Sequence, residues 1–264
     1  MKSGRDVLVI DDEPVITRAV ARICAEEGLT VDAADTGAAA LEMLAARSYR
    51  LIVCDIMMTD LDGFQLLEEA ARRGLRTPVV MATGYATLEN AVKSLSRGAA
   101  DFIAKPFTAD ELLAVVRRAL RGRRLQEEAA AGPRDTLAYV PCPPRYYRLG
   151  NVSWVKEERE GTALIGLSDL FLKTIDGVAG LELAAVSEEL PQGGICATVT
   201  SAAGDRHGVA SPIGGRILDV NAAAKSNPSA VEKDPYFEGW LYRVVPSDLH
   251  EDLKSLTSCS SDRL

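Results

Sequence analysis

The first half of the chain alternates short apolar runs with amphipathic stretches, and this pattern limits the possible folds more than any other feature. Several runs are hydrophobic throughout, as strands buried on both faces of a sheet are. Five runs are predicted as strands: Val7–Ile10, Leu29–Ala33, Leu51–Cys54, Pro78–Ala82 and Asp101–Ala104. The stretches predicted as helices are Pro14–Glu27, Gly37–Arg47, Gly63–Arg73, Leu88–Ser96 and the segment from Thr108 onward. Short connections between these elements predict a doubly wound α/β domain with a parallel five-stranded sheet.

The second half has a different pattern. The helix from Thr108 is predicted to continue through Gln126–Ala131, and a proline-rich linker follows it. Beyond the linker, short β-like runs are separated by Gly and Pro, which indicates a small β-rich barrel or sandwich. These runs are Ala163–Gly166, Leu181–Ala184, Ile195–Val199, Arg216–Val220 and Trp240–Val245, with one helical stretch at Ser168–Ile175. We expect four parts: a first domain (1–125), a helix extension with linker (126–145), a second domain (146–256) and a disordered tail (257–264).

Composition and charge exclude several classes of protein. The chain has 264 residues, of which 47% are hydrophobic and 26% charged, as in folded domains. Residues 1–125 hold 17 basic and 18 acidic side chains, so the rest carries −7 of the total −8. This acidic half argues against direct DNA binding. No membrane-length apolar run and no secretory pattern are present, so we expect a cytoplasmic protein. The five cysteines lack C-x-x-C spacing and are interpreted as reduced, packed thiols.

Polar residues stand at the ends of four predicted strands. Asp11 and Asp12 follow the first run, Asp55 the third, Thr83 the fourth and Lys105 the fifth. In an open α/β sheet these carboxyl ends meet at one edge, where ligands bind. Three neighbouring carboxylates repel one another unless a cation joins them, and Mg²⁺ suits such oxygen ligands. A carboxylate beside Mg²⁺ can accept a phosphoryl group, whose oxygens a hydroxyl and an ammonium can then contact.

Residues 1–125 resemble the receiver domain of two-component response regulators, which has a flavodoxin-like fold. The motifs that match are DDEP (11–14), CDIMMTDLDG (54–63), MATGY (81–85) and DFIAKPF (101–107). The resemblance implies that Asp55 is the phosphoacceptor. The donor would be a phosphohistidine of a sensor histidine kinase or phosphotransfer protein.

The same resemblance assigns roles to the other residues of the motifs. The Mg²⁺ ligands would be Asp11, Asp12, Asp55 and the backbone carbonyl of Met57. Thr83 and Lys105 would contact the phosphoryl group, Thr83 and Phe102 would form the switch, and the Lys105–Pro106 peptide would be cis.

Three further positions bear on the loop after Asp55 and on the rate of dephosphorylation. Thr59 stands where the family usually has Pro, and we expect it to loosen the loop after Asp55. Met57 and Tyr85 occupy positions that tune dephosphorylation in the family. Because a Met side chain does not hydrogen-bond an attacking water, slow self-hydrolysis is the expectation.

Residues 146–256 resemble the glycine cleavage system H protein, a lipoyl-domain-like β-barrel or sandwich. The cues are SWV (153–155), GTALIGLSD (161–169), GGICATVTSAAGDRHGVASPIGGRILDVN (193–221) and DPYFEGWL (234–241). In that family a lysine at a hairpin tip, in the motif ESxK, carries lipoate. Counting back eight residues from Pro212 places Gly204 at the lysine position, and SAAG (201–204) replaces ESxK. The resemblance therefore implies a domain without lipoate.

Other conspicuous side chains of the second half have plainer interpretations. Asp205, Arg206 and His207 are interpreted as a polar turn at the hairpin tip. A catalytic or metal-binding His207 is the alternative, for which the sequence offers no partner ligand. Trp154, Tyr236 and Trp240 are interpreted as packing residues.

The leading hypothesis is a response regulator rather than an enzyme, whose non-lipoylated second domain binds a protein that the sequence does not identify. Lipoate or glycine-cleavage enzymes are candidate partners. The sequence leaves alternatives open: a lipoyl-type carrier or glycine-cleavage accessory protein, and a transcriptional regulator that acts indirectly. A stand-alone receiver whose second half serves only as a dimerisation surface, and a homodimer that forms on phosphorylation, also stay open.

Overall fold

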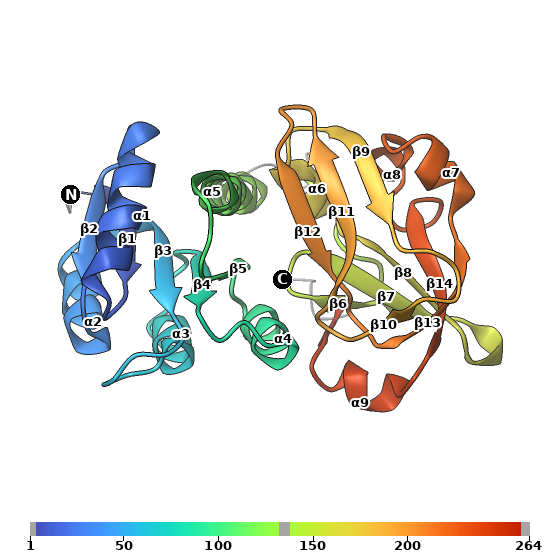
Figure 1. Cartoon of the computed structure of the whole chain (residues 1–264), viewed down its shortest axis with the longest axis horizontal. Helices are drawn as coiled ribbons and strands as arrows, with labels where there is room; N and C mark the ends of the chain where they lie inside the picture. The colour runs from blue at the N-terminus through green and yellow to red at the C-terminus, as the bar shows by residue number, and fades with distance from the viewer. Residues whose placement is uncertain (1–3, 132–137, 260–264) are drawn as a thin grey trace. The chain divides into compact units, whose positions relative to one another are not determined.

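The computed structural model describes residues 4–131 and 138–259, and the chain divides into two compact units (Figure 1). The first comprises Met1–Asn90 and Arg97–Arg123, and the second comprises Ala91–Ser96 and Arg124–Leu264. Within the described ranges, every helix is too short or too polar to cross a membrane.

The first unit contains a parallel five-stranded sheet in the order β2-β1-β3-β4-β5. Its strands are β1 (Gly4–Ile10), β2 (Val31–Ala34), β3 (Ser48–Asp55), β4 (Val79–Thr83) and β5 (Asp101–Ala104). The helices in this half of the sequence are α1 (Pro14–Glu26), α2 (Gly37–Ala46), α3 (Gly63–Arg72), α4 (Leu88–Ser96) and α5 (Ala109–Ala131). Residues of α1 and α5 pack on one face of the sheet, and residues of α2 and α3 pack on the other. This confirms the predicted doubly wound fold.

Local sequence explains most of these boundaries. Pro14 begins α1, where its missing amide hydrogen is not needed. Thr36 and Asp62 accept backbone hydrogen bonds and so cap α2 and α3. The predicted start of the second strand at Leu29 is wrong. Gly28 has a positive φ of 73°, and the Leu29 amide donates to Cys24 O at 3.1 Å, so both residues belong to the turn that closes the C-terminus of α1.

The second unit is a β-sandwich of two antiparallel sheets. The larger sheet has seven strands in the order β10-β13-β14-β8-β7-β6-β15, and the smaller has the order β12-β11-β9. The strands are β6 (Tyr147–Leu149), β7 (Ser153–Glu157), β8 (Ala163–Leu167), β9 (Val178–Leu183), β10 (Glu189–Leu190), β11 (Ile195–Ser201), β12 (Arg206–Ala210), β13 (Gly215–Val220), β14 (Trp240–Pro246) and β15 (Thr257–Ser258). The helices are α6 (Asp169–Thr174), α7 (Ala222–Ser226), α8 (Ala230–Lys233) and α9 (Leu249–Leu253), with a 3₁₀ turn at Arg159–Gly161. The predicted β-rich second domain is confirmed.

A small aromatic cluster packs beside the main core of the second unit. Tyr146, Trp154 and Tyr236 lie with ring centroids 5.0 to 6.3 Å apart. Trp154 is fully buried and donates from Nε1 to Leu167 O at 2.8 Å. Its ring lies against Gly166, where a Cβ atom would approach Cζ2 of the tryptophan to 2.3 Å. Trp154 and Tyr236 are therefore packing residues, as predicted.

The predicted bounds of the linker stay a prediction, and the structure corrects part of the predicted tail. The extension of α5 to Ala131 agrees with the prediction, and residues 132–137 lie outside the described ranges. The later part of the predicted linker is not free, because the Val140 amide donates to Asp169 Oδ2 at 2.6 Å and Cys142 is buried. The predicted disordered tail is wrong for 257–259, since β15 pairs with β6 and Cys259 is buried. The remainder, 260–264, is not described.

The buried hydroxyl of Tyr236 predicts how the stability of the second unit depends on pH. It donates to Val140 O at 3.0 Å and accepts from the Asp169 amide at 3.1 Å. Burial raises its pKa above the ordinary value of 10.0. Above pH 10.0 the unfolded chain therefore loses a proton that the folded chain keeps, so the free energy of unfolding falls as the pH rises.

Replacement of Tyr236 by Phe should reduce this alkaline loss of stability, while the buried Tyr242, whose pKa is also raised by burial, keeps part of it. The variant also leaves two backbone groups unpaired, which lowers stability at every pH by about 1–3 kcal/mol. Urea unfolding followed by tryptophan fluorescence reports on this unit, because both tryptophans, Trp154 and Trp240, lie in it. Tyr85→Phe, at an exposed position of the first unit, is the control. An unchanged slope above pH 10.0 in Tyr236→Phe would contradict the assignment.

Candidate functional site

Four neighbouring strands bring the predicted polar residues to one edge of the parallel sheet. Asp11 follows β1, Asp55 ends β3, Thr83 ends β4 and Lys105 follows β5. Asp11, Asp55 and Thr83 are buried, and the Lys105 side chain is only 7% exposed. Pairing of β4 with β3 and β5 sets their spacing, because Asp55 stands opposite Ala82 and Thr83 opposite Ala104.

Lys105 joins two carboxylates of the site. Its Nζ lies 2.6 Å from Asp11 Oδ2 and 2.6 Å from Asp55 Oδ2. Glu13 Oε1 lies farther away, at 3.7 Å from the same nitrogen. The Lys105–Pro106 peptide bond is cis, as the resemblance implied.

Burial and pairing oppose each other in the titration of these groups. Burial raises the pKa of Asp11, against the hydrogen bonds from Lys105 and the Glu13 amide. Burial alone would lower the pKa of Lys105, but hydrogen bonds to Asp11 and Asp55 outweigh it and raise the pKa. The ammonium therefore stays charged at neutral pH and partly offsets the repulsion between the carboxylates.

The carboxylates also form a set that fits a hard divalent cation. One oxygen each of Asp11, Asp12 and Asp55 lies within 4.8 Å of the others, in the described part of the chain. Oxygen ligands from carboxylates are those that Mg²⁺ takes in proteins. Met57 stands beside this set, since its amide donates to Asp55 Oδ1 at 3.1 Å. The single ammonium of Lys105 does not balance the three carboxylates, so these oxygens suit a further cation.

The two residues predicted as a switch pair lie on neighbouring strands, where Thr83 stands opposite Ala104 and Phe102 stands opposite Met81. Thr83 Oγ1 accepts a hydrogen bond from the Tyr85 amide at 3.1 Å. Phe102 is half-buried and packs against the core on the α2–α3 face. Met57 and Tyr85 are 54% and 66% exposed, so both side chains can influence access to the site from solvent.

The loop after Asp55 contains hydrogen bonds that the Thr59 substitution does not remove. The Gly63 amide donates to Ile56 O at 2.9 Å, which closes the base of the loop. Asp62 and Gln65 form a reciprocal capping box at the start of α3. Asp60, which is absent from the predicted site residues, accepts two hydrogen bonds from α2.

The hairpin between β11 and β12 contains Gly204, the residue that the count back from Pro212 assigns to the lysine position of the H-protein family. Gly204 lies in the turn with a φ of +90°, and a Cβ atom there would meet no described atom within 4 Å. The turn is closed by hydrogen bonds from the Gly204 amide to Ser201 O and from the Ser201 amide to Asp205 O, both 2.9 Å long.

The three residues after Gly204 do not form one polar turn. Arg206 makes a two-bond ion pair with Glu182 on β9, at 2.6 and 2.8 Å. His207 is only 4% exposed and packs edge-on against Phe171, with ring centroids 6.5 Å apart. The interpretation of His207 as part of the exposed tip is therefore wrong, because alternation along β12 points its side chain inward.

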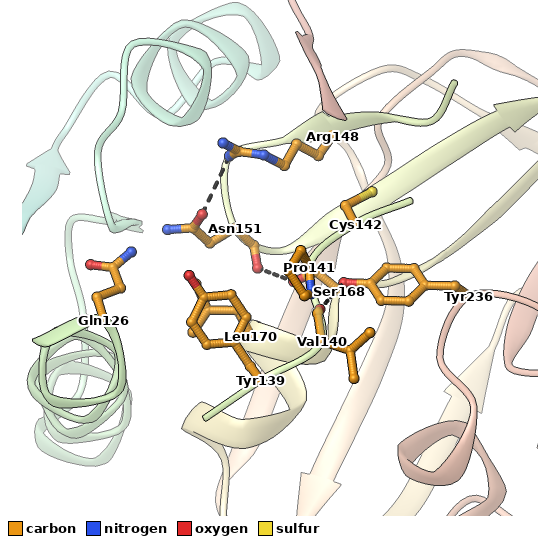
Figure 2. Close-up of a pocket in the computed structure, with 10 residues that line it drawn as sticks. All are labelled: Gln126, Tyr139, Val140, Pro141, Cys142, Arg148, Asn151, Ser168, Leu170 and Tyr236. Carbon is orange, nitrogen blue, oxygen red and sulfur yellow. Dashed lines mark hydrogen bonds between the residues drawn. The ribbon is translucent and has the colours of Figure 1, made fainter. Parts of the chain in front are cut away.

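Figure 2 shows the residues around the segment that precedes β6. The Tyr236 hydroxyl points to the Val140 backbone, and Arg148 Nη1 donates to Asn151 Oδ1 at 3.3 Å. Ser168 Oγ donates to Asn151 O. These polar groups thus bond to the protein itself. All five cysteines are buried free thiols, as predicted.

Comparison with protein families now identifies both halves of the chain. Residues 7–117 match the response regulator receiver domain, and residues 145–262 match the glycine cleavage H-protein. The chain joins a receiver domain to an H-protein domain.

Known proteins resemble one domain or the other. The nitrogen assimilation regulatory protein NtrX of Azorhizobium caulinodans is 43% identical over 127 residues, which are 47% of this chain and 28% of that protein. The crystal structure of the NtrX receiver domain from Brucella abortus is 43% identical and covers 44% of this chain and 98% of that chain, with a TM-score of 0.42. The crystal structure of a glycine cleavage system H protein from Mycobacterium marinum is 25% identical and covers 45% of this chain and 93% of that chain, with a TM-score of 0.40. The chain spans 28%, 26% and 50% of the length of the first three curated relatives.

Replacement of Lys105 by Met should destabilise the receiver domain in the absence of divalent cations. Two buried carboxylates then lose their partner, which costs about 3–5 kcal/mol when a buried ion pair is broken. Hydrogen-exchange protection of peptides from β1 and β3 measures the loss, and added MgCl₂ should restore part of it.

The matched control is Arg50→Met, which removes the exposed pair of Arg50 and Asp6 at 2.8 Å. A surface pair contributes about 0–1 kcal/mol. Equal losses of protection in the two variants would contradict the role given to Lys105.

Proposed function

We propose that this chain is a two-component response regulator in which Asp55 accepts a phosphoryl group from a phosphohistidine. The observation that carries the proposal is the gathering of Asp11, Asp12, Asp55, Thr83 and Lys105 at one edge of the sheet. The match to the receiver family supports the same function. A sensor histidine kinase or a phosphotransfer protein would be the donor.

The chemistry requires one bond to form and one to break. A carboxylate oxygen of Asp55 attacks phosphorus, the P–N bond of the phosphohistidine breaks, and the imidazole nitrogen keeps the electron pair. Asp11, Asp12, Asp55 and the Met57 carbonyl would hold Mg²⁺, which neutralises developing charge when bound. Lys105 would exchange its contact with Asp55 Oδ2 for one with a phosphoryl oxygen, and so keep the added charge paired.

Phosphorylation would act on the domain surface through Thr83. The phosphoryl group offers acceptor oxygens beside the hydroxyl, which now accepts from the Tyr85 amide. Rotation of Thr83 toward these oxygens would vacate space into which Phe102 can move from its half-buried position. The change then reaches the β4–α4 loop and β5.

The H-protein domain would be the output and would bind a protein partner without carrying lipoate. The lipoyl arm needs a lysine amine, and Gly204 occupies its position in the β11–β12 turn. The net charge of −7 over residues 126–264 disfavours direct contact with DNA phosphates. Lipoate and glycine-cleavage enzymes are candidate partners because they bind proteins of this fold.

Asp55→Asn should abolish phosphorylation, because an amide oxygen is too weak a nucleophile to displace the phosphohistidine nitrogen. The full chain is incubated with Mg²⁺ and a phosphorylated histidine kinase, and the intact mass is measured. Asp35→Asn makes the same substitution at an exposed position and should be phosphorylated like the wild type. Full phosphorylation of Asp55→Asn would contradict the proposed phosphoacceptor.

The wild-type chain should gain no lipoyl group when incubated with a lipoate ligase, lipoate and ATP. Gly204→Lys supplies the missing amine. The space around the Cβ is open, but the φ of +90° strains any residue other than glycine, so the melting temperature of the variant is measured as well. Mass spectrometry of both proteins, with the ligase's own H protein as positive control, tests the proposal. A lipoyl adduct on the wild type would favour the carrier function instead.

A further inference from the structure

The loop that links β3 to α3 carries the backbone next to the proposed cation site. At its start, the Met57 amide donates to Asp55 Oδ1 at 3.1 Å, and the Gly63 amide closes its base on Ile56 O. Thr59 lies between these points and, unlike proline, has no ring that fixes its φ angle. A further contact is therefore needed to hold the outer part of the loop.

Asp60 makes that contact with a different helix. Its Oδ1 accepts from the Gly37 amide at 3.1 Å, and its Oδ2 accepts from the Ala38 amide at 3.0 Å. These amides belong to the first turn of α2, whose N-terminus favours a negative charge. The hydrogen bonds from Ala38 and Gly37 lower the pKa of Asp60, so the carboxylate stays ionised and keeps both acceptor oxygens at neutral pH.

Leu61, the residue after Asp60, also packs against the first turn of α2. A Cβ atom on Gly37 would lie 2.6 Å from Leu61 Cβ, so the loop approaches α2 more closely than an alanine would permit. The loop is thus joined to α2 by two charge-assisted hydrogen bonds and by close packing.

We propose that Asp60 is a positioning residue for the divalent cation, because it holds the loop that presents the Met57 carbonyl. The proposal rests on the response-regulator function proposed above. Mg²⁺ requires nearly ideal octahedral geometry, so displacement of one oxygen ligand weakens binding. Residues that orient metal ligands from outside typically change metal affinity by about 10–100-fold. Asp60 lies three residues after Met57. Because Thr59 does not fix the backbone as proline would, the hydrogen bonds of Asp60 to α2 hold the outer part of the loop.

The test compares Asp60→Ala with Thr36→Ala in the full chain. Thr36 caps the same turn of α2, since its Oγ1 accepts from the Ala39 amide at 3.1 Å, but it makes no bond to the loop in the described structure. Both variants weaken the helix terminus, whereas Asp60→Ala alone releases the loop. Mn²⁺ serves as the probe, and its binding is measured by electron paramagnetic resonance, with Asp12→Asn as background.

The expected result is a rise of about tenfold in the Mn²⁺ dissociation constant of Asp60→Ala. Thr36→Ala should stay within about twofold of the wild type, although its melting temperature also falls. Asp60→Asn keeps one acceptor oxygen and should lie between wild type and Asp60→Ala. Melting temperatures of all variants separate loss of positioning from loss of fold.

Two results would overturn the inference and are distinguishable from each other. Equal Mn²⁺ affinity in Asp60→Ala and Thr36→Ala would show that Asp60 only stabilises the helix. A wild-type chain that binds no Mn²⁺ above the Asp12→Asn background would overturn the proposed cation site itself, and the role of Asp60 with it.

Discussion

The pairing of Lys105 with Asp11 and Asp55 is the interaction on which the rest of the site depends. Two buried carboxylates at the end of β1 and β3 would repel each other, and the ammonium that follows β5 lies 2.6 Å from both. The parallel sheet makes this possible, because strands that are distant in sequence end at one edge. The charge of Lys105 suits both the unphosphorylated and the phosphorylated state of the proposed switch. Lys105 balances the acids before phosphorylation and would balance the phosphoryl group afterwards.

The two domains use different means to bury their apolar residues. The receiver domain covers both faces of its sheet with helices, which is why its strands are apolar throughout. The H-protein domain packs two sheets together and buries a second cluster around Trp154. Its β11–β12 hairpin turns at Gly204, whose positive φ suits glycine. The proposed role in protein recognition rests on the assignment of Gly204 to the lysine position.

Features set by local sequence were predictable, and features set by distant contacts were not. The five strands and the site residues at their ends follow from apolar runs that stop at polar residues. The predicted start of β2 was wrong because Gly28 and Leu29 form the turn after α1 instead. The ordered residues 257–259 depend on pairing with β6, and nothing in their own serine-rich sequence indicates it.

Local sequence also fails to predict the placement of two single residues, His207 and Asp60. The polar neighbours of His207 resemble a turn, but its place on β12 directs it into the core. Asp60 resembles any loop aspartate, and its partners on α2 lie 22 and 23 residues away in the chain.

The most direct test of the central claim locates the phosphoryl group on the chain. The full protein is phosphorylated with Mg²⁺ and a phosphohistidine donor and treated at once with borohydride, which reduces an aspartyl phosphate to homoserine. Peptide mass spectrometry then reads the position. The account predicts homoserine at position 55 and at no other aspartate of the chain. Homoserine at another position, or a phosphoryl group that resists borohydride, would contradict it.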